Sequence, residues 1–188
     1  LVSVLICFVI GVPLGVIASY NKWYRDIQNV VLDAMQTLPY FCYLIPVLMF
    51  FGGNIVSAVI ATVIYSVPPI IRLTALGLSQ VSGSYSEVSK SFGGTGIQTL
   101  NKVKFPLAVP SLVMGFNQTV IMAFAMQIVT PLIGGKGLGL QVFNALQRSD
   151  TGRGLSAGLA IVLLAIIIDR ITHAWTKKQR QALGLDKS

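Results

Sequence analysis

Long apolar runs are the feature that most constrains this chain. Five stretches are dominated by apolar side chains, residues 1–19, 27–51, 55–78, 110–132 and 155–175. A helix rises about 1.5 Å per residue and the hydrocarbon core of a bilayer is about 30 Å thick, so a span needs about 20 such residues. The runs are continuous and lack the two-residue alternation of strands. The sequence therefore predicts an all-helical membrane bundle of about five transmembrane helices.

The composition excludes a water-soluble globular domain. Charged residues make up 11% of the 188 residues and hydrophobic residues 54%, whereas a soluble domain carries about 25% charged residues. Cys7 and Cys42 lie inside apolar runs and match no metal-ligand spacing or disulfide framework, so both are interpreted as apolar packing residues. Leu1 opens directly onto an apolar run without an initiating methionine, and we expect a longer chain to precede it.

The basic residues predict the orientation of the bundle. Eleven of the fourteen lie on one side of the predicted spans, and only Lys136, Arg148 and Arg153 lie on the other. Because lysine and arginine are enriched on the cytoplasmic side, the chain is expected to begin outside and to end inside. The net charge of +8 is then a consequence of topology, and no nucleic-acid partner is needed. Residues 1–176 form the predicted transmembrane domain, and residues 177–188 form a cytoplasmic tail.

The cytoplasmic loop over residues 79–109 is too long to be a passive connection. Ser84 and Glu87 have the spacing of a capping box, which predicts a short helix over residues 85–92. The glycines at 93–94 can end that helix in the left-handed conformation. A rigid element that projects from the membrane in this way suits the transmission of force to a soluble partner.

A second capping box follows, from Thr95 to Gln98. It predicts a second short helix that ends at about Lys104, because the residue before Pro106 is disfavoured in the helical region. The loop is thus predicted to be a helix, a glycine corner and a helix.

The same loop resembles the EAA signature of binding-protein-dependent ABC importer permeases. The spacing of Glu87, Gly93, Val103, Phe105, Pro106 and Pro110 matches the signature. The departures are Val88 and Ser89 in place of the two alanines, Val103 in place of isoleucine and Phe105 in place of leucine. The resemblance implies a type I importer permease whose short helix docks on a cytoplasmic ATPase. The implied coupling residues are Ser86, Glu87, Val88, Ser89, Gly93 and Pro106. The alternative is an amphipathic helix on the membrane surface in which Glu87 only caps the helix.

A closer resemblance covers nearly the whole chain. Residues 33–39, 43–46, 117–119, 132–139, 147–150 and 169–172 are similar to segments of glycine betaine and related quaternary-amine permeases. This implies a permease subunit of the bacterial inner membrane that moves glycine betaine, proline betaine or choline, and that is not itself an enzyme. It also implies three partners: ATPase subunits that bind ATP and Mg²⁺, an extracytoplasmic binding protein and a second permease copy. No cofactor is expected on this chain.

Two other functions remain open on the residues. The chain could serve an importer of another small zwitterionic or methylated compound. It could also be an ion-coupled secondary transporter, for which Asp33 is the one candidate ion site within a span.

A candidate translocation path lies in the fourth run. Gln118, Met122 and Met126 recur at intervals of four, with Asn117 beside them. Helix packing through small and polar residues explains this pattern. A soft, uncharged lining for a methylated ammonium group explains it as well.

Few of the remaining motifs indicate chemistry. Arg72 and the pair at 169–170 lie near the cytoplasmic ends of spans, where snorkelling and helix-end pairing account for them. His173, the only histidine, is interpreted as interfacial. The glycine-rich segment at 134–139 matches no phosphate-binding loop, and we expect it to turn the chain and let a short helix fold back. The sequence contains no catalytic or metal-binding constellation.

Overall fold

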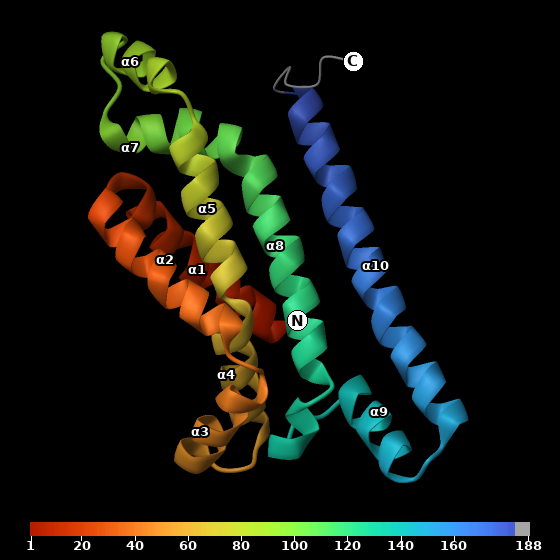
Figure 1. The fold of residues 1–188 in the computed structure, drawn as a ribbon. Coiled ribbons are helices and arrows are strands. Elements are labelled where there is room, and N and C mark those ends of the chain that lie inside the picture. Colours follow the sequence, from red (N-terminus) through yellow and green to blue (C-terminus); the bar gives the residue numbers. More distant parts are fainter. Residues whose placement is uncertain (183–188) are drawn as a thin grey trace.

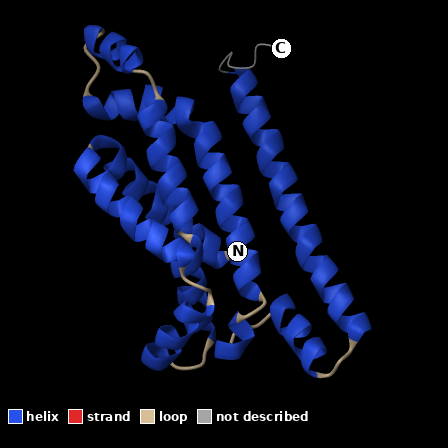
Figure 2. Cartoon of the chain, viewed as in Figure 1, coloured by secondary structure: helices blue, strands red, loops and turns tan. Residues whose placement is uncertain are grey.

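The computed structural model describes residues 1–182. Within them every regular element is a helix (Figure 2). Four stretches are long and apolar enough to cross a membrane, namely Val2–Tyr20, Ile55–Gln80, Gly96–Gln127 and Thr151–Lys178, and a bent pair of helices can supply a fifth. The predicted all-helical fold of about five spans is therefore confirmed.

The second predicted span, over residues 27–51, is broken. The chain runs through α1 (Val2–Tyr20), α2 (Lys22–Thr37) and α3 (Phe41–Phe51). The axes of α2 and α3 differ by 96°. The break falls at Leu38, whose ψ of 131° is extended because the next residue is Pro39. The Tyr43 hydroxyl on α3 donates to the Met35 carbonyl on α2, and this bond holds the two helices at their angle.

The third predicted span agrees closely with the structure. Helices α4 (Ile55–Ser66) and α5 (Pro68–Gln80) meet at Val67, which keeps helical dihedral angles. Pro68 and Pro69 occupy the first positions of α5, where a proline needs no N–H partner. The two helices therefore continue as one rod in spite of the paired prolines.

The second half of the chain carries longer helices than predicted. It contains α6 (Gly83–Ser91), α7 (Gly96–Thr99), the π-helix η1 (Leu100–Lys104), α8 (Phe105–Gln127), the 3₁₀ helix η2 (Thr130–Ile133), α9 (Leu138–Gln147) and α10 (Thr151–Ala182). The predicted fold-back helix is α9, which follows positive φ angles at Gly134 and Gly137. Helix α10 continues beyond the predicted end at residue 175, and residues 183–188 of the predicted tail lie outside the described residues.

Helix α5 is the centre of the packing, with α1 on one side and α8 on the other. Gly15 lets α1 approach, since a Cβ there would lie 2.6 Å from the Cβ of Thr74 and 2.7 Å from the Ile71 carbonyl oxygen. Ile70 and Leu78 of α5 are almost completely buried in this core. Membrane helices associate by such close backbone contact because the lipid supplies no hydrophobic drive between them.

The two ends of the bundle differ (Figure 1). Helices α6 and α7 project at the same end at which α10 terminates, whereas α3 and α9 lie at the opposite end. Helix α10 packs on α8 and α9, and most of its apolar side chains are exposed. The projecting loop and the predicted outer turn are therefore separated by the length of the bundle.

Candidate functional site

The first coupling helix, α6, begins two residues earlier than predicted. Ser82 is its N-cap, and the Ser82 hydroxyl accepts from the Ser84 N–H at 3.4 Å. The predicted capping box from Ser84 to Glu87 is therefore wrong. Within the described residues the Glu87 carboxylate makes no hydrogen bond, and its side chain is exposed on the projecting helix. A group that is not used in folding is free to contact a partner.

A glycine corner ends α6 as predicted. Gly93 has a φ of +74°, and its N–H donates to the Lys90 carbonyl at 2.9 Å. The predicted capping box at Thr95 is confirmed, because Thr95 N–H donates to Gln98 Oε1 at 2.9 Å and Gln98 N–H donates to Thr95 Oγ1 at 3.4 Å. The corner and the cap together set the angle between α6 and α7.

The second helix of the loop does not end at Lys104. From Gly96 to Gln127 the chain is one continuous helical stretch. Its turn around η1 is wider than an α-helical turn, since Phe105 N–H donates to the Leu100 carbonyl five residues back. Pro106 has no N–H and its ring needs room in the preceding turn, and a π-turn at this point accommodates both. The coupling loop is therefore continuous with α8.

Apolar side chains cover the projecting loop. Tyr85, Val88 and Ile97 are exposed, and Phe92 keeps 88% of its surface exposed. Large apolar side chains gathered on a projecting element indicate an interaction surface. Val88 is one of the predicted coupling residues, and Ser86 and Ser89 beside it are half-buried.

The four predicted path residues do not form one surface. Met126 is 1% exposed in a core with Tyr43 and Val47, and Asn117 is 7% exposed against α10. Gln118 is exposed and Met122 is half-buried. A step of four residues advances a helix by 400°, so positions 118, 122 and 126 drift around α8 from its surface into the interior.

Asn117 instead belongs to a polar network between α8 and α10. Its Nδ2 donates to Asp169 Oδ1 at 3.1 Å, and its Oδ1 accepts from Thr172 Oγ1 at 2.5 Å. His173 Nε2 lies 3.4 Å from the same Asp169 oxygen. This arrangement supports the structural interpretation of Asp169, whose partner on α8 lies 52 residues away and gave no local signal in the sequence.

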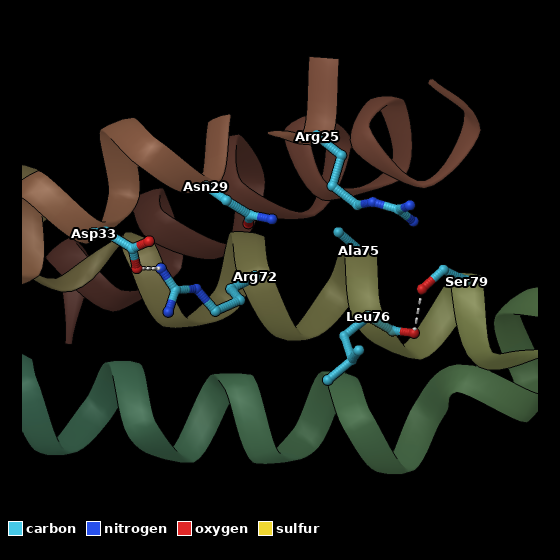
Figure 3. A pocket seen from close by; sticks show the side chains of 7 residues that line it. All are labelled: Arg25, Asn29, Asp33, Arg72, Ala75, Leu76 and Ser79. Atoms are coloured by element: carbon cyan, nitrogen blue, oxygen red, sulfur yellow. Dashed lines mark hydrogen bonds and ion pairs between the residues drawn. The ribbon is translucent and has the colours of Figure 1, made fainter. Parts of the chain in front are cut away.

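Asp33 and Arg72 form an ion pair that the sequence did not predict (Figure 3). Arg72 Nη2 on α5 lies 2.5 Å from Asp33 Oδ1 on α2. The pair borders a cavity of about 540 Å³ that Arg25, Asn29 and Ser79 also line. The two arginines and the aspartate give this cavity a formal charge of +1. It is a second polar site, separate from the coupling loop.

Comparison with known proteins decides the family. Residues 11–181 match the family of binding-protein-dependent transport system inner membrane components. The chain belongs to this family. It shares its fold with the methionine ABC transporter MetNI in inward-facing conformations, with a TM-score of 0.78 and 22% identity, over 93% of this chain and 89% of that chain.

Three relatives in the family have named cargo. The chain is 46% identical to the glycine betaine/carnitine permease GbuB of Listeria monocytogenes, over 96% of this chain and 64% of the relative. It is 44% identical to the glycine betaine permease OpuAB of Bacillus subtilis, over 92% and 61%. It is 43% identical to the glycine betaine/proline betaine permease ProW of Escherichia coli, over 96% and 51%. The chain thus spans between half and two thirds of the length of these relatives.

Side chains that could bind a metal ion do not cluster in the part of the chain that the structure describes. Within residues 1–182 no group of three or more His, Cys, Asp or Glu side chains lies close enough to hold a metal ion. Cys7 is buried and lies 3.5 Å from the Ser66 hydroxyl, while Cys42 is exposed. The interpretation of Cys7 as a packing residue agrees with this position.

Proposed function

We propose that this chain is the membrane-spanning permease part of an ATP-driven importer, and that its cargo is a quaternary-amine osmolyte such as glycine betaine. One observation carries the proposal: three permeases whose names include glycine betaine are 43–46% identical to nearly the whole chain. In this proposal the chain forms the pathway, and separate ATPase subunits bind ATP and Mg²⁺.

The exposed face of α6 supports the coupling role. A soluble ATPase would dock on Tyr85, Val88 and Phe92, with Glu87 at the polar edge of the same contact. Gly93 would set the angle of this helix, and Pro106 would fix the joint with α8. ATP binding can shift the permease between two states only through contacts that differ between those states. In this chain α6 and α7 are the projecting elements that could make such contacts.

The arrangement of the two ends supports the proposed orientation. The projecting loop and the C-terminal end of α10 lie at the same end of the bundle (Figure 1), the end to which the sequence assigns most of the basic residues. We place this end in the cytoplasm of a bacterial cell. The opposite end, with α9 and Arg148, would then receive cargo from an extracytoplasmic binding protein. A second permease copy would cover part of the exposed apolar surface of the chain.

Uptake and co-purification together test the proposed function. Cells that lack their own betaine import and express the permease with its partners should accumulate labelled glycine betaine, and unlabelled proline betaine should compete. The purified permease should bring a nucleotide-binding subunit with it. Uptake of a sugar with no competition by any betaine would refute the cargo, and a permease that transports without any ATPase would refute the importer class.

A further inference from the structure

The cavity between α2 and α5 is a polar seam built from two facing helices. Arg25, Asn29 and Asp33 follow one another at intervals of four on α2, and Arg72 and Ser79 lie on α5 (Figure 3). Side chains three or four residues apart share one helix face, so α2 turns a polar stripe toward the cavity, and α5 faces it with Arg72 and Ser79 on either side of Ala75 and Leu76. Arg25 lies in the first turn of α2 and Ser79 in the last turn of α5, at the end of α5 that leads to the coupling loop.

The opposite face of α2 is apolar. Trp23, Ile27, Val30 and Val31 are all exposed in the chain. A helix with its apolar face outward and Arg25 and Asp33 toward the cavity reverses the pattern of a water-soluble surface. In a membrane this arrangement keeps these two charges against a hydrated interior, where intramembrane charges mark ion and substrate pathways.

The ion pair at the centre of the seam leaves hydrogen-bonding capacity unused. Arg72 and Asp33 share one contact, with one guanidinium nitrogen and one carboxylate oxygen, although this pair can form two parallel bonds. The Nε of Arg72 is buried without a partner. Among the described residues Arg25 takes part in no ion pair, and the Asp33 side chain keeps 63% of its surface exposed. Two arginines can still donate, and one carboxylate can still attract a cation.

We infer that this cavity binds the cargo as a zwitterion during its passage to the cytoplasm, with Arg72 and Arg25 on the carboxylate and Asp33 beside the quaternary ammonium. The inference rests on the proposed function and narrows its substrate class. A molecule with one charge of each sign can exchange its own ion contacts for those of the pair, so no charge is left without a partner. The cavity of about 540 Å³ is large enough for a small osmolyte.

Cargo charge then decides selectivity. Choline has the ammonium group of glycine betaine but no carboxylate, so the arginines would lose their ligand. In 3,3-dimethylbutyrate a neutral carbon replaces the ammonium nitrogen of glycine betaine at nearly constant shape. This isostere would press an apolar group against Asp33 and desolvate its carboxylate without compensation. Both analogues should therefore bind more weakly than glycine betaine.

A cysteine at the rim of the cavity reports on its occupation. The assay uses the assembled transporter in lipid nanodiscs, with Cys7 and Cys42 replaced by alanine and Ser79→Cys as the labelling site. Ser79 lines the cavity, is exposed and differs from cysteine by one atom. Millimolar glycine betaine should slow the reaction of this cysteine with N-ethylmaleimide. The matched control is Lys178→Cys, which is exposed on α10 and does not line the cavity, and its rate should not change.

Two neutral variants separate a binding site from a purely structural ion pair. In Ser79→Cys the half-protecting concentration should be about tenfold lower for glycine betaine than for 3,3-dimethylbutyrate, as expected for one charge-assisted contact. Asp33→Asn should abolish this difference, and Arg72→Gln should reduce the difference between glycine betaine and choline to what Arg25 alone supplies. The conservative variants Asp33→Glu and Arg72→Lys should retain both differences. A purely structural pair would change stability in all four variants and selectivity in none.

Uptake of glycine betaine by the same variants, reconstituted in sealed proteoliposomes, keeps this inference separate from the proposed function. Uptake without protection of Ser79→Cys would overturn the cavity assignment and leave the importer assignment intact. Equal protection by inorganic phosphate and glycine betaine would also overturn it, because the cavity would then be a general anion or lipid-headgroup site. Absence of betaine uptake in the unmodified transporter would refute the proposed function itself.

Discussion

The hydroxyl of Ser89 on α6 lies 2.8 Å from the hydroxyl of Thr99 at the end of α7. This hydrogen bond closes the inside of the glycine corner. The Gly94 N–H donates to the Ser89 carbonyl at 2.9 Å, so Ser89 makes two hydrogen bonds across the corner. The direction of α6 is therefore fixed relative to α7, and through η1 relative to α8.

Opening this corner should reduce transport and substrate-stimulated ATP hydrolysis together. Gly93→Val places a β-branched residue at a φ of +74°, which costs an ordinary L-residue about 1–2 kcal/mol and a β-branched one more. We expect membrane levels near normal, with betaine uptake and substrate-stimulated ATPase activity both reduced about tenfold or more. Gly96→Ala is the matched control, because Gly96 has ordinary dihedral angles and open space around its Cα. Normal coupling in Gly93→Val would contradict the role of the corner.

Charge reversal at Glu87 should affect coupling and leave folding intact. The side chain is exposed and makes no hydrogen bond within the described residues, so Glu87→Lys should change the free energy of unfolding by less than about 0.5 kcal/mol. Uptake and stimulated ATP hydrolysis should fall together in reconstituted vesicles. Gln181→Lys, an exposed position near the end of α10, should transport normally. A cysteine at Glu87 that never cross-links to the ATPase in an intact complex would count against the proposed contact.

Filling the contact between α1 and α5 should destabilise the bundle. Gly15→Leu forces side-chain atoms into Thr74 and the Ile71 carbonyl, and overpacking of this kind costs about 1–3 kcal/mol. The purified permease should unfold at a lower temperature and reach lower levels in membranes. Gly158→Ala on α10 serves as the control, since a Cβ at Gly158 meets nothing within 4 Å. Equal thermal stability of the two variants would show that α1 does not pack on α5 in this way.

The network around Asn117 should contribute to stability. Asn117→Leu removes one hydrogen bond to Asp169 Oδ1 and one from the Thr172 hydroxyl. Both groups are only partly buried and keep other partners, so each lost bond costs about 0.5–1.5 kcal/mol. Thermal unfolding of the purified permease should reveal this loss. If Asn117 lines the translocation path, as the sequence analysis predicted, betaine uptake per folded molecule of Asn117→Leu should also fall. Unchanged uptake per folded molecule would assign Asn117 to packing alone.

Thiol labelling can test the proposed orientation. In a variant without Cys7 and Cys42, Ser149→Cys between α9 and α10 should react with an impermeant reagent added outside intact cells. Lys178→Cys at the other end of α10 should react only after the membrane is permeabilised. The reverse pattern would place α6 outside the cell and separate it from any cytoplasmic ATPase.

Features set by local chemistry could be predicted from the sequence. The apolar runs, the left-handed Gly93 and the capping box at Thr95 each depend on a few neighbouring residues, and the structure contains all three. The start of α6 shows the limit of such patterns. Ser82 and Ser84 are both good N-caps, and the spacing to Glu87 favoured the second, but the chain leaves the extended region already at Ser82.

Features set by tertiary contacts could not be predicted. The sequence predicted one continuous span over residues 27–51, and the break before Pro39 with its angle of 96° depends on how Tyr43 reaches back to Met35. Asp33 and Arg72 are 39 residues apart, and nothing local shows that α2 and α5 face each other. The helix continues through Pro106 by way of a π-turn, in which Phe105 N–H reaches the Leu100 carbonyl, and no local sequence pattern predicted this wider turn.

The π-turn at η1 determines the direction in which α6 points relative to α8. Gly96–Gln127 is one helical stretch of 32 residues, in which α7 runs across the end of the bundle before α8 descends through it (Figure 1). The extra residue in the wide turn around Phe105 sets how far α6 and α7 are rotated about the axis of α8. Each residue of an α-helix advances the phase by about 100°. Removing one residue from η1 would thus leave α8 in place and point α6 in another direction.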